Sequence, residues 1–228
     1  MDLNNLNPFD TKTANNIHYQ QFLTQGPDGE IECILSSPLE NKPIKNIAII
    51  CHPHPLYSGS MNNKVVFTIA KTLNKYNIPV LRFNFRGVER SEGKYDNGIG
   101  EKKDLQAVAN LMRELYPSQS LWLGGFSFGS YIAASMQQTL NAKHLITVAP
   151  AVISFDFDAF PEPDCSWLLI QGLADEVVDA NEVLNWANNL QKPPVIHTLE
   201  NTSHFFHRRL VDLAKIIEND IKENCDDE

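Results

Sequence analysis

The sequence predicts an α/β protein with a mostly parallel central sheet, helices on both faces and an antiparallel hairpin at its N-terminal end. From residue 46 onward, short apolar runs alternate with segments that carry apolar residues at helical spacing, which is typical of parallel strands joined by crossover helices. Before residue 46, two β-like runs, Ile17–Leu23 and Ile31–Ser36, flank a turn that contains Gly26, Pro27 and Gly29. Two such runs around a turn favour a hairpin.

The strands of the parallel sheet are expected at short runs rich in apolar residues, and the first of them is a continuous apolar run that suits a strand buried on both faces. These runs are Asn46–Cys51, Pro79–Phe85, Leu121–Gly125, His144–Val148, Trp167–Gln171 and Val195–Leu199. Helices are expected between and after them, at Asn63–Tyr76, Glu101–Leu115, Phe128–Leu140, Asn181–Leu190 and Phe205–Ile221. The interval 149–165 between two of these strands is irregular and contains three prolines.

We expect a loose N-terminal arm over residues 1–16, a single domain over 17–222 and an acidic tail over 223–228. The chain has 228 residues and a formal net charge of −9, which argues against nucleic acid or an anionic membrane as its partner. Its four cysteines are widely spaced, which disfavours a zinc site or a disulfide framework. We see neither a signal peptide nor a membrane-spanning run. A cytoplasmic protein is therefore expected.

One motif organises the rest of the sequence. Gly125-Phe126-Ser127-Phe128-Gly129 stands between an apolar run and a segment with helical potential. A serine in a sharp strand-to-helix turn can act as a nucleophile, and its neighbours two positions away must be small to let the turn close. Ser127 is therefore the candidate nucleophile.

Two further candidates follow other predicted strands, and the carboxyl ends of parallel strands meet at one edge of a sheet. Asp175 follows the strand at 167–171 and His204 follows the strand at 195–199. A serine needs a base to accept its proton, and imidazole titrates near neutral pH when unperturbed. His204 is the candidate base, and Asp175 the acid that fixes its tautomer.

Alternatives to these candidates remain open. The alternative for Asp175 is a residue of a surface turn without a catalytic role. The alternative for His204 is a histidine that only begins a helix. His197 and His207 compete with His204 as the base, and Asp156 or Asp158 are alternative acids.

Backbone N–H groups are expected to stabilise the oxyanion. One is that of Phe128, directly after the serine, and the other comes from the loop after the strand at 46–51. Pro53 and Pro55 have no N–H, so His54 is the expected second donor. The spacing of His52 and His54 also allows a metal reading, but no third ligand is evident nearby. We therefore expect no metal and no cofactor.

The assembled motifs resemble the α/β-hydrolase superfamily over residues 17–221. More narrowly, the chain is similar to small bacterial α/β-hydrolases, through Cys-His-Pro-His-Pro-Leu-Tyr at 51–57, Met-Asn-Asn-Lys-Val-Val at 61–66, Arg-Phe-Asn-Phe-Arg-Gly-Val at 82–88 and the elbow at 125–129. These relatives resemble dienelactone-hydrolase-like and acyl-peptidase-like domains that lack a large lid. Lids in this superfamily are commonly inserted after the strand that corresponds to 144–148, and the interval 149–165 is too short for a helical cap, so the resemblance implies a minimal lid. The resemblance implies a triad of Ser127, Asp175 and His204, with an oxyanion hole at His54 and Phe128. Leu173 departs from the usual polar residue of the acid loop.

We expect a metal-independent serine hydrolase that cleaves small acyl esters through an acyl-enzyme. A peptidase or thioesterase with the same triad is one alternative, and a non-catalytic binding protein of the same fold is another. Leu56, Tyr57 and Phe155 are the candidate substrate contacts, although such aromatics could equally belong to the core. The expected partner is a small ester, with a homodimer possible.

Arg86, after the strand at 79–85, has two interpretations. It could recognise a carboxylate in the pocket, or it could form an ion pair that holds the loop at 87–100.

Overall fold

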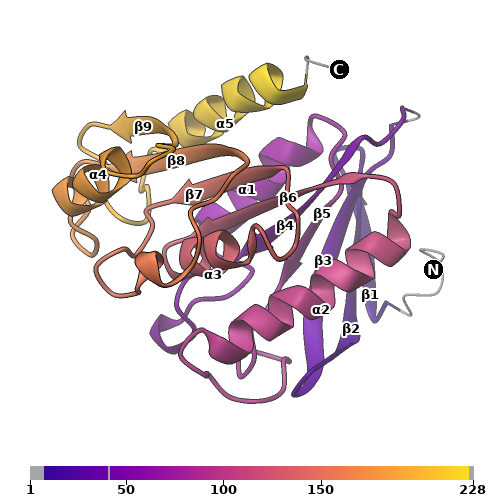
Figure 1. The fold of residues 1–228 in the computed structure, drawn as a ribbon. Coiled ribbons are helices and arrows are strands. Elements are labelled where there is room, and N and C mark those ends of the chain that lie inside the picture. Colours follow the sequence, from indigo (N-terminus) through magenta and orange to yellow (C-terminus); the bar gives the residue numbers. More distant parts are fainter. Residues whose placement is uncertain (1–7, 41, 226–228) are drawn as a thin grey trace.

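The computed structural model describes residues 8–40 and 42–225 and confirms the predicted architecture (Figure 1). Its nine strands form one sheet in the order β1-β2-β3-β5-β4-β6-β7-β8-β9. The pairs β1–β2, β2–β3 and β3–β5 are antiparallel. Every pair from β5 to β9 is parallel, so the strands of this half all end at one edge of the sheet.

The elements follow the predicted order. The strands are β1 Asp10–Ala14, β2 Ile17–Gly26, β3 Gly29–Pro38, β4 Asn46–Cys51, β5 Val80–Phe83, β6 Ser120–Phe126, β7 His144–Val148, β8 Ser166–Gly172 and β9 Val195–Leu199. The α-helices are α1 Lys64–Asn74, α2 Ile99–Leu115, α3 Phe128–Met136, α4 Ala180–Asn188 and α5 Leu210–Cys225. Among the described residues, two short 3₁₀ helices, Pro55–Tyr57 and Phe157–Ala159, lie in loops.

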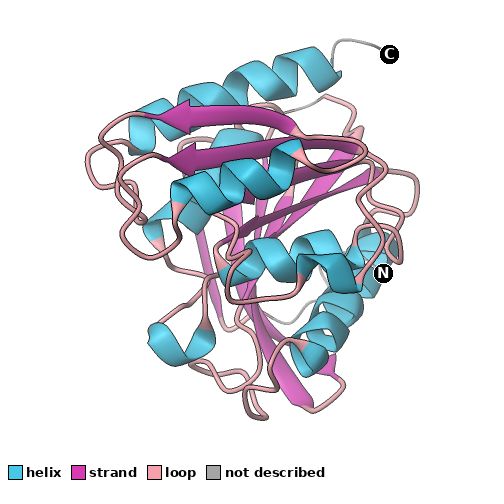
Figure 2. Cartoon of the chain, turned by 60° about the vertical axis from the view of Figure 1, so that its left-hand side comes forward, coloured by secondary structure: helices cyan, strands magenta, loops and turns pink. Residues whose placement is uncertain are grey.

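The central strands are apolar on both faces because helices cover both (Figure 2). Ile49 of β4 points to the side where the apolar residues of α2 and α3 are packed. The next residue, Ile50, belongs to the opposite side, which is covered by α1 and α5. Successive side chains of a strand alternate between faces, so the uninterrupted apolar run of β4 serves two cores.

The N-terminal arm predicted over residues 1–16 is wrong at residues 10–14, which form β1. All five residues of this strand are exposed, so it has no apolar pattern, and it is held by its pairing with β2. Asn15 and Asn16 join the two strands with φ of 51° and 61°, the left-handed conformation that tight hairpin turns require. Residues 1–7 of the predicted arm lie outside the described residues.

The last helix begins and ends later than predicted. Phe206 and Arg208 have φ of 54° and 61°, which a helix does not allow, so α5 starts at Leu210. It continues to Cys225, so residues 223–225 of the predicted acidic tail are helical, and residues 226–228 lie outside the described residues. Helix α3 ends at Met136, four residues before its predicted end. No helix in the described part of the chain is long and apolar enough to span a membrane.

Candidate active site

Ser127 lies in a strained turn between β6 and α3. Its φ of 54° and ψ of −115° are rare for a residue with a side chain and cost on the order of 1–3 kcal/mol. The turn can close because its flanking residues are glycines. A Cβ on Gly125 would lie 2.2 Å from the Gly129 carbonyl carbon, and one on Gly129 would lie 2.3 Å from the Cys51 oxygen. The second contact presses the start of α3 against the end of β4.

Asp175 and His204 meet at the carboxyl ends of β8 and β9. His204 Nδ1 lies 2.8 Å from Asp175 Oδ2, although the two residues are 29 positions apart. The His204 side chain is 3% exposed and the Asp175 side chain is 0% exposed. The ring of Phe126 packs against the His204 imidazole at a centroid distance of 4.9 Å. A shielded imidazole–carboxylate pair of this kind holds the ring in one orientation.

Backbone donors keep the Asp175 carboxylate ionised. Its Oδ1 accepts hydrogen bonds from the N–H groups of Val177 at 2.9 Å and Val178 at 2.8 Å. Burial alone would raise the pKa of this carboxyl, but the hydrogen bonds from His204, Val178 and Val177 outweigh burial, and the pKa lies below its usual value. An ionised Asp175 makes His204 Nδ1 the donor, which leaves Nε2 as an acceptor.

Ser127 and His204 line the same cavity. No hydrogen bond joins the Ser127 hydroxyl to His204 in the described part of the chain. Catalytic hydrogen bonds of this type often tighten only when substrate is bound.

The loop after β4 is fixed by His52. This side chain is fully buried, and burial lowers its pKa to about 3, so the ring is neutral. Its Nε2 accepts from the Phe85 N–H at 3.0 Å, which makes Nδ1 the donor to the Pro53 carbonyl oxygen at 2.6 Å. Both ring nitrogens are therefore used to hold the loop, and the His-x-His spacing serves loop structure.

His54 lines the cavity and packs beside the elbow. Its ring contacts those of Tyr57, Tyr95 and Phe128 at centroid distances of 4.8, 4.7 and 5.2 Å, and its Nδ1 accepts from the Leu56 N–H. Phe128 is the first residue of α3, so its N–H has no carbonyl one turn earlier within the helix. The structure thus brings the loop of His54 and the start of α3 together beside Ser127.

The cavity at Ser127 has a volume of about 310 Å³. Its lining consists of Pro53, His54, Tyr57, Ser58, Gly59, Asn63, Ser127, Val177, His204 and Phe205. Of the three predicted substrate contacts, this lining includes Tyr57 and leaves out Leu56 and Phe155. Leu56 is 67% exposed. The Phe155 ring instead stacks on Tyr131 at 5.0 Å, within the aromatic core behind α3.

The competing candidates lie outside this cavity. His197 and His207 are exposed. Asp156 caps the short helix at 157–159 by accepting from the Asp158 N–H, and Asp158 is exposed within that helix.

Sequence reasoning missed several residues that support or line the site. Gln171 donates to Asp175 Oδ2 at 3.2 Å, and the Glu176 carboxylate accepts from the His204 N–H at 3.1 Å. Val177 and Phe205 line the cavity. Glu176 and Phe205 directly follow Asp175 and His204, and Val177 lies two positions after Asp175, so proximity in the sequence is the signal that could have found them. Gln171 lies within β8, and no such signal marks it.

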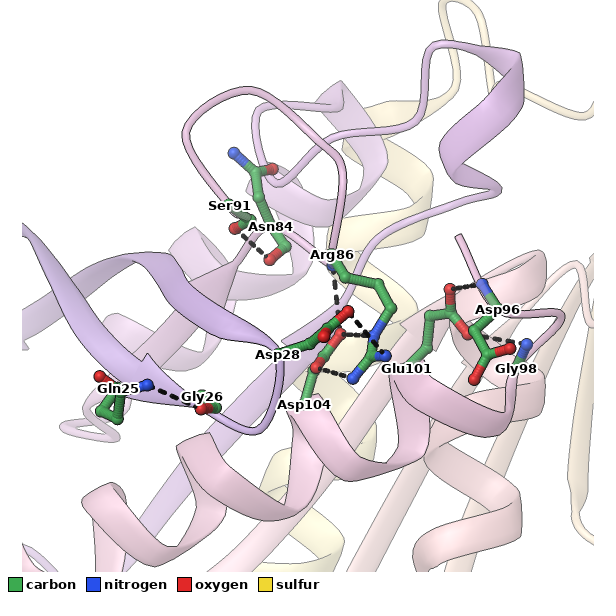
Figure 3. Close-up of polar contacts among 10 residues, drawn as sticks. All are labelled: Gln25, Gly26, Asp28, Asn84, Arg86, Ser91, Asp96, Gly98, Glu101 and Asp104. Atoms are coloured by element: carbon green, nitrogen blue, oxygen red, sulfur yellow. Dashed lines mark hydrogen bonds and ion pairs between the residues drawn. The ribbon is translucent and has the colours of Figure 1, made fainter. Parts of the chain in front are cut away.

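Arg86 holds the loop that follows β5, as one of its two interpretations predicted. It donates to both oxygens of Asp104, from Nε at 3.0 Å and Nη2 at 2.7 Å (Figure 3). Asp28 lies 3.5 Å from the other end of the guanidinium. On α2, Glu101 accepts from the N–H groups of Asp96 and Gly98. The loop is therefore tied at both ends to α2, and Arg86 has its carboxylate partner inside the protein.

Comparison with known proteins agrees with this architecture. A family model described as "Alpha/beta hydrolase domain" matches residues 58–225. The "Uncharacterized protein RP471" of Rickettsia prowazekii (strain Madrid E) is 34% identical over 207 residues, and the match covers 86% of this chain and 86% of the relative.

Two solved structures are similar over nearly the whole chain. XC6422 from Xanthomonas campestris, described as an α/β serine hydrolase without a lid, has a TM-score of 0.86 at 37% identity and covers 94% of this chain and 97% of its own. An α/β serine hydrolase homologue from Coxiella burnetii has a TM-score of 0.84 at 40% identity, over 93% of this chain and 100% of its own. The chain therefore belongs to the α/β-hydrolase family, and its similarity to serine hydrolases supports a hydrolase activity.

Proposed function

We propose that this protein hydrolyses small carboxylic esters with Ser127 as nucleophile, His204 as general base and Asp175 as the acid that orients His204. Ser127 Oγ attacks the ester carbonyl while His204 Nε2 takes its proton. The oxyanion accepts hydrogen bonds from the Phe128 and His54 N–H groups. His204 then protonates the leaving alcohol, and water, activated by the same nitrogen, releases the acid from the acyl-enzyme.

The observation that carries this proposal is the 2.8 Å hydrogen bond between His204 and Asp175 beside Ser127 in its left-handed turn. Asp175 fixes the proton on His204 Nδ1, and the other nitrogen is then the acceptor that a serine nucleophile requires. Because Ser127 and His204 line the same cavity, a substrate carbonyl bound there can approach both side chains.

The walls of the cavity support a small, largely apolar substrate. Tyr57, Val177 and Phe205 are 81%, 61% and 41% exposed, so the mouth of the cavity is apolar and open to solvent. A volume of about 310 Å³ is at the lower end for a small-molecule site. Short acyl groups fit these properties better than long chains, and the open mouth leaves room for varied alcohols.

Labelling with a fluorophosphonate probe tests the activated serine directly. The wild type should be labelled, and labelling should be lost in Ser127→Ala and strongly slowed in His204→Ala. Ser154→Ala and His207→Ala are matched controls, because both side chains are exposed and neither lines the cavity. A folded wild type that does not react, or a reaction that survives Ser127→Ala, contradicts the proposed nucleophile.

A panel of leaving groups separates the ester proposal from its alternatives. Acetyl and butyryl oxyesters, thioesters and anilides of equal acyl length should be compared by kcat/KM. We expect the oxyesters of short acids to be preferred. A preference for thioesters or anilides would be consistent with the proposed triad but would contradict the proposal that carboxylic esters are the substrates.

The cytoplasmic location and the homodimer stay predictions. Fractionation of the source cells tests the first, and sedimentation equilibrium of the purified chain tests the second.

A further inference from the structure

A second cavity lies on the face of the sheet that α1 covers, next to the N-terminal hairpin. It has a volume of about 240 Å³. Its floor includes one row of paired residues across four strands, in which Asp10 is opposite Gln21, Gln21 opposite Ile34 and Ile34 opposite Arg82. Paired residues point to the same face, so these side chains share one surface. Asn62 and Phe67, at the start of α1, also line the cavity.

Arg82 forms the inner end of this row and lacks an acidic partner. The residue is 4% exposed. Its Nη1 donates to the Met61 carbonyl oxygen at 2.6 Å, and its Nε is shielded from solvent without a hydrogen-bond partner. No carboxylate of the described chain forms an ion pair with it. Arg86 on the same chain segment has Asp104, and the contrast makes Arg82 an unpaired buried cation.

The acidic side chains of this region are used elsewhere or lie too far away. The buried Glu32 carboxylate accepts from Gln21 at 2.7 Å and from Asn84 at 2.7 Å. Asp10 is exposed on the edge strand and lies three strand spacings from Arg82, which is about 14 Å. Neither carboxylate neutralises the guanidinium.

Burying a charge without a counter-charge costs free energy. A ligand that brings the counter-charge removes this cost, and the free energy recovered favours its binding. Burial lowers the pKa of Arg82 to about 10, and the guanidinium therefore stays charged at neutral pH. Lys12 adds a second cation nearer the mouth, with its Nζ 5.5 Å from the centre of the Tyr19 ring. The cavity thus favours an anion.

The lining also limits the kind of anion. Arg82 is the buried cation of this lining, and a singly charged group balances it. The Phe67 ring lies 5.3 Å from the Arg82 guanidinium, and Ile34 lies beside it in the row, so an apolar body can follow the charged group. A guanidinium matches a carboxylate in shape and hydrogen bonding.

We propose that this cavity binds a small organic carboxylate, with its charged group at Arg82 and its short apolar chain against Phe67 and Ile34. The site is separate from the cavity at Ser127, and the two share no lining residue. A single ion pair of this kind predicts binding at about 1 mM, which is about −4 kcal/mol.

Titration followed by NMR of the ¹⁵N-labelled protein tests the site at the atom concerned. The Arg82 Nε–H signal, assigned by its loss in Arg82→Gln, should shift saturably with butyrate and not with butyramide, which has the same chain without the charge. Inorganic phosphate should bind more weakly than butyrate. In Ala14→Phe, which adds a ring to the cavity lining and keeps Arg82, the affinity for butyrate should fall at least tenfold.

Arg90→Gln is the matched control, because Arg90 is an exposed arginine on the same segment and its loss changes the net charge equally. It should leave butyrate binding unchanged. The proposal is overturned by the absence of a saturable shift, by an equal shift with butyramide, or by unchanged affinity in Ala14→Phe. Binding of phosphate alone would also overturn it. Ala14→Phe decides the question even where Arg82→Gln does not fold.

Discussion

Replacing the Asp175 carboxylate with an amide of the same shape is expected to reverse the tautomer of His204. Two backbone N–H groups, from Val177 and Val178, donate to Asp175 Oδ1 at 2.9 and 2.8 Å. In Asp175→Asn they hold the single amide oxygen at this position, so the NH₂ group faces His204 Nδ1. Nδ1 must then accept, and the proton moves to Nε2, the nitrogen that is proposed to take the proton of Ser127.

The wrong tautomer cannot act as the base, so the loss should match that of the same change in serine proteases, about 10⁴-fold in kcat. This factor corresponds to about 5 kcal/mol of transition-state stabilisation. The assay is the hydrolysis of p-nitrophenyl butyrate, with the rate of fluorophosphonate labelling as a second readout. ¹⁵N NMR of the imidazole reports the tautomer directly.

Asp179→Asn is the matched control, because Asp179 is an exposed carboxylate that caps α4. It should keep wild-type activity. Activity of Asp175→Asn within tenfold of the wild type, or an imidazole that still carries its proton on Nδ1, would refute the reasoning.

The same variant has a consequence for stability against pH. The pKa of Asp175 is lower in the folded chain than its usual value, which is about 3.9 when unfolded. Its ionised form therefore contributes stability that is present above about pH 4 and lost as the pH falls through the folded pKa. In urea unfolding from pH 7 to pH 3, the advantage of the wild type over Asp175→Asn should shrink at the acid end. An advantage that is constant over this range would contradict the lowered pKa.

Three further substitutions test the packing of the elbow, the ion pair that holds the loop after β5 and the wall of the cavity at Ser127. Gly129→Ala places a Cβ 2.3 Å from the Cys51 oxygen, and urea unfolding should show a loss of about 3 kcal/mol. Asp104→Asn removes the buried counter-charge of the Arg86 guanidinium, whose side chain is 8% exposed, and leaves only the exposed Asp28 at 3.5 Å; it should cost about 3 kcal/mol in the same assay. Phe205→Ala removes an apolar wall of the cavity, and should shift the optimum of kcat/KM toward longer acyl groups in an ester series.

Matched variants separate these effects from general damage. Asp212→Asn breaks a half-exposed ion pair with Arg209 and should cost no more than about 1 kcal/mol. Leu173→Ala trims a partly exposed side chain outside the cavity lining and should leave acyl preference unchanged. A larger loss in Asp212→Asn than in Asp104→Asn, or equal preferences in Phe205→Ala and the wild type, would contradict the corresponding prediction.

The parallel half of the fold was predictable because its strands leave a strong signal. Asn46–Cys51 and His144–Val148 are mostly apolar and almost entirely buried, since helices cover both of their faces. Strand β1 has no such signal, because Asp10–Ala14 is exposed on every residue and is defined by backbone pairing with β2. The start of α5 was also missed, since nothing in the residue types of Phe206 or Arg208 indicates a left-handed backbone.

Sequence order located the proposed catalytic residues better than it located the pocket walls. Asp175 and His204 each follow a strand, and the topology then brings them within hydrogen-bond distance. Which aromatic side chains face the cavity depends on the path of the loops after the strands. Phe155 packs inward onto Tyr131, whereas Phe205 faces the cavity, and hydrophobicity alone does not distinguish the two.

The close approach of Gly129 to Cys51 has an implication for how this protein could diversify. The elbow and the loop of His54 are held by glycine contacts and by the buried His52, where substitution is restricted. Val177, Phe205 and Tyr57, in contrast, are exposed side chains that line the cavity. Under the proposed function, reactivity and selectivity therefore depend on separate groups of residues. Mutagenesis libraries restricted to the cavity mouth should change substrate range while leaving the framework of the reaction intact.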